Sequence, residues 1–122
     1  MIVVDASVAL KWIITKEQNS DQALILQKRH IEGKEGIVVP DLFFIEVANA
    51  LVTKSETSPA MVKDAMDLLF QVALETERPV EKDLFLAAKL AKKYKTSVYD
   101  MLYAVVAKRH KTILVTADEN FK

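Results

Sequence analysis

Short apolar blocks alternate along the chain with longer segments in which apolar residues recur every three or four positions. The short blocks are rich in β-branched residues and contain no polar alternation, which is typical of strands buried on both faces. They lie at Ile2–Val4, at Gly36–Asp41, where Pro40 ends the block, and at Thr112–Thr116. The segment Glu77–Val80 is expected to be a short connecting or edge strand.

The longer segments predict helices, and local signals mark their ends. Ser20 and Asp21 favour a helix start, Gly33 a glycine cap, and Pro59 the first turn of a helix. The predicted helices are Ser7–Ile14, the segment from Asn19 to Gly33, Leu42–Thr53, Ser58–Val72, Asp83–Lys93 and Val98–His110. This alternation indicates an α/β fold, with a short parallel sheet flanked by helices on both faces as an α/β/α sandwich. We expect a single domain, residues 1–122.

Charge and composition narrow the function classes. Lys+Arg and Asp+Glu both number 17, so the chain lacks the basic excess of a protein that binds nucleic acid by bulk charge. It has no cysteine, which excludes disulfides and thiolate metal sites. No apolar run approaches the roughly 20 residues of a membrane span, and no signal peptide is evident, so we expect a cytoplasmic protein. The 51% apolar content also favours a surface for self-association.

Four acidic residues stand out because each is isolated in an apolar block. Asp5 is the sole charge in Met1–Leu10, Glu46 in Leu42–Thr53 and Asp100 in Ser97–Ala107, while Asp118 follows the apolar strand directly. Most other acids, Asp83 among them, lie near lysines or at helix starts and fit a solvated surface. Taken singly, Asp5 and Asp118 also fit helix N-caps, and Glu46 fits a helix edge that points at water.

Taken together, these acids indicate a metal site. The carboxyl ends of parallel strands converge on one crevice, and Asp5 and Asp118 follow two such strands. Crowded carboxylates repel one another unless a cation lies between them. A cluster that contains only oxygen ligands favours Mg²⁺ or Mn²⁺, which can activate a water and stabilise the leaving oxygen of a phosphodiester.

The sequence resembles the PIN domain over essentially its whole length. The resemblance lies in four segments in the family's order, Ile2–Ser7, Glu46–Leu51, Tyr99–Ala104 and Leu114–Asp118. Among PIN domains it is most similar to the VapC-type toxins of toxin–antitoxin pairs. The resemblance implies that Asp5, Glu46, Asp100 and Asp118 are metal-binding catalytic acids, supported by the Thr116 hydroxyl. It also implies Mg²⁺- or Mn²⁺-dependent cleavage of RNA, a homodimer, and inhibition by a partner antitoxin. Family members usually continue past the last of these segments, whereas this sequence ends at Lys122.

Two polar residues have alternative interpretations. Ser7 is expected either to hydrogen-bond a water or phosphate at the site or to cap the first helix. Asn49 follows Glu46 by one helical turn and is expected either to orient that carboxylate or to be a satisfied core amide.

Basic residues near helix ends are candidates for contact with an RNA backbone. Lys11 follows the Asp5 turn, Arg29 lies in the run Lys28–His30, and Lys108 and Arg109 lie in the run Lys108–Lys111. A solvated helix end is the alternative for each of them.

Two alternatives to a toxin remain open. One is a PIN nuclease of RNA processing outside a toxin–antitoxin pair, and the other is a non-catalytic binding module that retains the fold.

Overall fold

The computed structural model describes residues 1–13, 20–53 and 56–117, and its centre is a four-stranded parallel sheet with the order β3-β2-β1-β4. The strands are β1 (Ile2–Val4), β2 (Ile37–Pro40), β3 (Glu75–Glu77) and β4 (Leu114–Val115). Strand β1 pairs with β2 on one side and with β4 on the other. The strand order therefore reverses between β1 and β4, and open parallel sheets commonly bind ligands beyond the carboxyl ends of the strands at such a reversal.

The helices agree with the sequence predictions. They are α1 (Ala6–Ile13), α2 (Ser20–Ile31), α3 (Leu42–Thr53), α4 (Pro59–Gln71), α5 (Glu81–Tyr94) and α6 (Val98–Arg109). The predicted signals are in place: Gly33 has a φ of 75° after α2, and the Ser58 hydroxyl accepts the Met61 N–H before Pro59 opens α4. The α/β/α expectation is confirmed.

The edge strand β3 differs from the prediction. Its residues are Glu75–Glu77 and not Glu77–Val80, and it pairs in parallel with Val38–Pro40. Backbone hydrogen bonds set this strand, because its Glu-Thr-Glu sequence carries no apolar signal. Strand β4 is also shorter than the predicted block.

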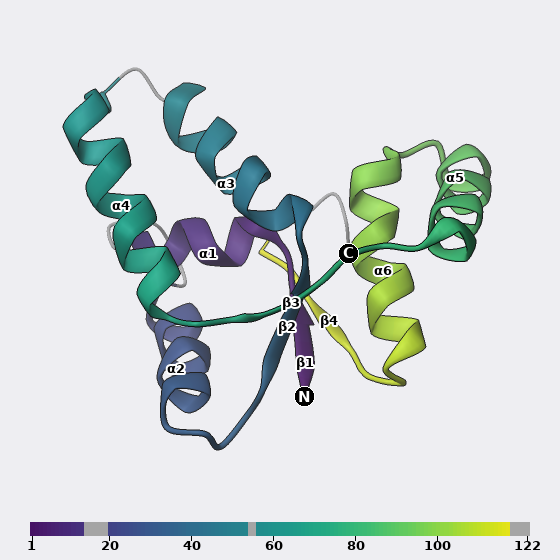
Figure 1. The fold of residues 1–122 in the computed structure, drawn as a ribbon, viewed down its shortest axis with the longest axis horizontal. Helices are drawn as coiled ribbons and strands as arrows, with labels where there is room; N and C mark the ends of the chain where they lie inside the picture. The colour runs from purple at the N-terminus through teal and green to yellow at the C-terminus, as the bar shows by residue number, and fades with distance from the viewer. Residues whose placement is uncertain (14–19, 54–55, 118–122) are drawn as a thin grey trace.

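Helices cover both faces of the sheet. In Figure 1 the strands lie between a group formed by α1, α2, α3 and α4 and a second group formed by α5 and α6. The central core joins the sheet to α6 and α3 through fully buried side chains of Val3, Val38, Phe43, Val47 and Val106. Outside it, α5 packs on α6 through Ala87, Leu102 and Val105.

Different helix ends lie at the carboxyl and at the amino ends of the strands. Helices α1 and α3 begin next to the carboxyl ends of β1 and β2, whereas α2 and α6 end next to the amino ends of β2 and β4 (Figure 1). No helix of the described ranges combines the length and apolar character needed to cross a bilayer.

Candidate metal-dependent active site

Asp5 lies at the end of β1 and at the beginning of α1. Its side chain accepts a hydrogen bond from the Ser7 backbone N–H at 3.1 Å and a second from the Ser7 hydroxyl, both at Oδ1. Asp5 is therefore the N-cap of α1, as one of its two sequence interpretations held. The residue is only 9% exposed, so this carboxylate is nearly buried at the switch point of the sheet.

Ser7 links the carboxyl ends of β1 and β4, which are neighbours in the sheet. Its Oγ accepts the backbone N–H of Ala117 at 2.9 Å and lies 3.4 Å from the Thr116 hydroxyl, both beyond β4. Ser7 does not cap α1, because Asp5 holds that place. Its hydroxyl instead orients Asp5 and ties that residue to the chain after β4.

Glu46 lies half-buried on α3, and its partner is a residue that the sequence reasoning missed. The Tyr103 hydroxyl of α6 donates to Glu46 Oε1 at 2.6 Å. Tyr103 lies three residues after Asp100, which places both on one helical face, and its phenol needs a partner when buried. Those two facts are the signal by which it could have been found. Asn49 is exposed, so it is not a core amide, and its role in orienting Glu46 stays a prediction.

Asp100 lies in the first turn of α6, partly buried. Its backbone N–H donates to Ser97 Oγ at 3.1 Å, and its Oδ2 accepts the Thr96 hydroxyl at 3.2 Å. Ser97 is the N-cap of the helix. The Ser97 cap and the Thr96 hydroxyl hold this carboxylate at the start of α6.

The charges of Asp5 and Asp100 act on the carboxyl group of Glu46. Burial raises the pKa of Asp5 above its ordinary value, against the lowering effect of hydrogen bonds from Ser7 and Thr116. Burial also raises the pKa of Glu46, and the negative charges of Asp100 and Asp5 raise it further. The carboxyl group on α3 is therefore influenced by the two acids at the starts of α1 and α6. In the described part of the chain none of the three forms an ion pair with Lys, Arg or His.

The chemistry of these donors, which are all carboxylate oxygens, suits a hard divalent cation. The three acids offer only oxygen ligands and carry negative charge, which are the features that Mg²⁺ and Mn²⁺ favour. Within residues 1–13, 20–53 and 56–117 no three Asp, Glu or His side chains gather closely enough to hold a metal ion by themselves. The fourth acid of the predicted set, Asp118, lies outside these residues.

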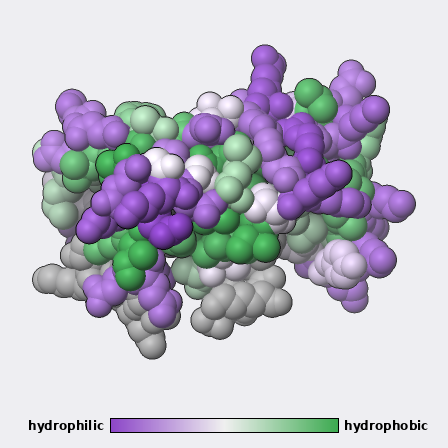
Figure 2. Space-filling view, turned by 90° about the horizontal axis from the view of Figure 1, so that it is seen from below, coloured by the Kyte–Doolittle hydropathy of each residue, from purple (hydrophilic) through white to green (hydrophobic). Residues whose placement is uncertain are grey.

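The predicted RNA-contacting residues fall on two sides of the sheet. Lys11 lies on α1, half-buried and six residues after Asp5. Arg29 and Lys108 lie exposed at the ends of α2 and α6, at the amino edge of the sheet and opposite the acids. Figure 2, seen from below, shows that face, over which hydrophilic side chains are widely spread between smaller hydrophobic areas.

Arg109 forms ion pairs with two carboxylates of the protein itself. Its Nη1 lies 2.6 Å from Asp83 Oδ2, and its Nη2 is paired with Glu77, which also pairs with His110. The expectation that Asp83 lies on a solvated surface is wrong: the residue is 6% exposed and also accepts the Val80 backbone N–H at 3.0 Å. A buried carboxylate needs such partners, and the sequence did not show that the end of α6 would provide one.

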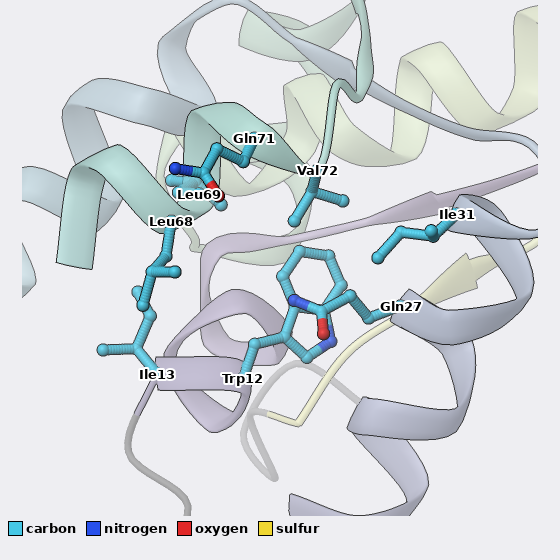
Figure 3. A pocket seen from close by; sticks show the side chains of 8 residues that line it. All are labelled: Trp12, Ile13, Gln27, Ile31, Leu68, Leu69, Gln71 and Val72. Atoms are coloured by element: carbon cyan, nitrogen blue, oxygen red, sulfur yellow. The ribbon is translucent and has the colours of Figure 1, made fainter. Parts of the chain in front are cut away.

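A separate cavity of about 310 Å³ lies between α1, α2 and α4. Its lining is mostly apolar, with two glutamines, and contains none of the acids: Trp12, Ile13, Gln27, Ile31, Leu68, Leu69, Gln71 and Val72 (Figure 3). The Trp12 ring stands in this cavity while its Nε1 donates to the Ala23 carbonyl at 2.7 Å.

Comparisons with known proteins agree with this geometry. A family model described as PIN domain matches residues 2–122. No curated protein matches the sequence significantly. Among solved structures, the chain resembles Mycobacterium tuberculosis VapC20, described as a sarcin-ricin loop cleaving toxin, with a TM-score of 0.75 and 14% identity over 99% of this chain and 92% of that one.

Two further structures share the fold. The protein PAE2754 of Pyrobaculum aerophilum has a TM-score of 0.74 and 20% identity over 98% of this chain and 76% of that one. A structure of VapBC2 from Rickettsia felis, bound to a DNA fragment from its promoter, has a TM-score of 0.70 and 16% identity over 99% of this chain and 91% of that one.

Proposed function

Because this chain belongs to the PIN domain family, we propose that it is an endoribonuclease that hydrolyses RNA phosphodiester bonds with Mg²⁺ or Mn²⁺ as cofactor. The observation that carries the proposal is the set of three carboxylates, Asp5, Glu46 and Asp100: the charges of Asp5 and Asp100 act on Glu46, and none of the three forms an ion pair in the described residues. Such a set binds a cation more readily than it stays bare.

In this proposal Asp5, Glu46 and Asp100 hold the cation, together with Asp118. A bound Mg²⁺ or Mn²⁺ ion supplies charge stabilisation at the phosphate and lowers the pKa of a water. Ser7 and Thr116 orient Asp5, and Thr96 orients Asp100. Lys11 lies on the side of the sheet where the acids lie, and we assign it to contact with an RNA phosphate.

We further propose the role of toxin in a toxin–antitoxin pair. The names of VapC20 and VapBC2 support this assignment through the shared fold. The partners would be an antitoxin protein and a second copy of the chain. The protein would act in the cytoplasm, where its RNA substrate is. Helices α3 and α4 expose the apolar surface that such partners need, at Ile45, Val52, Met61, Leu68 and Phe70. A small gene for a partner protein next to this one would support the toxin role.

The test of nuclease function is cleavage of a defined RNA panel with Mg²⁺, with Mn²⁺ and with EDTA. We expect cleavage with either metal and none with EDTA. Asp5→Asn and Asp100→Asn should each abolish cleavage and leave the circular dichroism spectrum unchanged, because each removes a charged ligand and keeps its shape. Asp64→Asn, at an exposed acid on α4, is the matched control and should cleave normally. Cleavage by the pure Asp5→Asn or Asp100→Asn variant would refute the site.

A further inference from the structure

Tyr103 brings a neutral hydrogen-bond donor into the cluster of acids. The residue is 1% exposed, its ring belongs to the central hydrophobic core, and its hydroxyl donates to Glu46 Oε1 at 2.6 Å. This hydrogen bond joins α6 to α3, and its two residues are 57 positions apart in the sequence. It is a short, charge-assisted hydrogen bond, and bonds of this kind are stronger than those between neutral groups.

A tyrosine suits this place better than a cationic side chain would. A phenol keeps its proton at neutral pH, because its ordinary pKa is about 10, and here it donates that proton to Glu46. A lysine or arginine would neutralise the carboxylates and repel an incoming divalent cation. The phenol orients one carboxylate oxygen and adds no charge, so the cluster remains negative.

The contact also limits the freedom of a flexible side chain. Glu46 has several rotatable bonds and lies half-buried on α3, so without a partner its carboxylate can turn between the crevice and water. The hydrogen bond uses Oε1. The phenol therefore leaves the second oxygen, Oε2, available for another contact.

We propose that Tyr103 is a positioning residue of the metal site: its buried hydroxyl on α6 holds the Glu46 carboxylate of α3 in the orientation that binds the divalent cation. The inference rests on the proposed function and deepens it. Tyr103 touches neither the cation nor the RNA, and it acts through Glu46.

The direct test is Tyr103→Phe, which keeps the core ring and removes only the hydroxyl. Mn²⁺ binding, measured by isothermal titration calorimetry, should weaken about 10- to 100-fold, the range expected when a partner of a metal ligand is lost. At saturating Mn²⁺ the KM for RNA should stay unchanged while kcat falls. Tyr94→Phe removes the hydroxyl of an exposed tyrosine on α5 and is the matched control, for which neither quantity should change.

A second comparison shows whether the effect passes through Glu46. In a Glu46→Ala background the phenol has no carboxylate to hold, so adding Tyr103→Phe should leave Mn²⁺ affinity unchanged within about twofold. If Tyr103→Phe still weakened Mn²⁺ binding in that background, the tyrosine would act by another route and the inference would be wrong.

The outcomes separate this inference from the proposed function. A wild-type protein that neither binds Mn²⁺ nor cleaves RNA refutes both. A wild-type protein that does both, with Tyr103→Phe binding Mn²⁺ equally well, refutes only the role of Tyr103. The same conclusion holds if Tyr103→Phe lowers only the melting temperature, because a purely structural tyrosine would do that without changing metal affinity.

Discussion

The ion pair between Arg109 and Asp83 allows a test of whether Arg109, at the end of α6, stabilises the fold or binds RNA. The sequence predicts that Arg109 binds RNA, whereas the structure pairs its guanidinium with Asp83 and Glu77. Arg109→Met removes the charge and keeps most of the apolar stem of the side chain. The variant leaves Asp83 as a buried carboxylate that retains only the Val80 N–H as a hydrogen-bond partner in the described residues.

The expected loss of stability follows from this geometry. Breaking a buried ion pair by removing one partner costs about 3–5 kcal/mol. The Arg109 side chain is 35% exposed and the Asp83 side chain 8%, so solvent screens one end of the pair. We therefore expect about 2–3 kcal/mol of lost unfolding free energy. For a chain of 122 residues this corresponds to a melting temperature lower by roughly 8–12 °C.

A double variant separates stability from RNA contact. Asp83→Asn keeps an acceptor for the Val80 N–H and removes the buried charge, so Arg109→Met combined with Asp83→Asn should recover to within about 1 kcal/mol of the wild type. Urea unfolding followed by circular dichroism measures both variants. The KM for RNA is then measured on the stable double variant, where we expect the wild-type value.

Two results would refute this reasoning. A loss below about 0.5 kcal/mol in Arg109→Met would show that the network is no stronger than an ordinary surface contact. A raised KM in the folded double variant would show instead that Arg109 contacts RNA, as the sequence predicts.

Two further predictions concern the acids themselves. In EDTA, Asp5→Asn should have a higher free energy of unfolding than the wild type at pH 7, and this difference should become smaller as pH falls. Urea unfolding from pH 7.5 to 4.5 measures both proteins. A difference that grows on acidification would contradict the prediction. The direction follows from the pKa values of Asp5 and Glu46, which are higher in the folded protein than the unfolded values near 3.8 and 4.5. Protonation of these groups therefore stabilises the fold. This stabilisation is complete below the unfolded pKa values and is lost as pH rises through the folded ones. Ser7→Ala should cost about 1–2 kcal/mol in thermal unfolding and reduce kcat, because it leaves the Ala117 N–H without its acceptor and removes a donor to Asp5; an unchanged melting temperature would show that this link carries no stability.

The positions of the isolated acids were readable from the sequence for a definite reason. A charge inside an apolar block stands out by contrast, and a block that reads as a parallel strand places its last residue at one edge of the sheet. Asp5, Glu46 and Asp100 were singled out by this contrast, and in the structure the charges of Asp5 and Asp100 act on Glu46; their role as metal ligands stays a prediction. Asp118 lies outside the described residues, so its place in the site stays a prediction.

The partners of these acids were not readable in the same way. Tyr103 and Glu46 meet across 57 residues, Ser7 and Ala117 across 110, and Arg109 and Asp83 across 26. Each of these polar groups also suits a surface or a helix cap when seen only in its local segment. Asp83 illustrates the difficulty, since the features that mark an ordinary helix start also mark a carboxylate buried against an arginine.

The sequence by itself determined the α/β alternation, the helix limits and the acids that stand without a local counter-charge, because these depend on periodicity and contrast between neighbouring residues. Only the tertiary structure decided which hydroxyl orients each acid, which arginine is bound to the protein, and which edge of the sheet each basic run faces. These contacts depend on how the helices pack across the sheet. Packing brings together residues that are far apart in the sequence, and no local sequence pattern indicates that they meet.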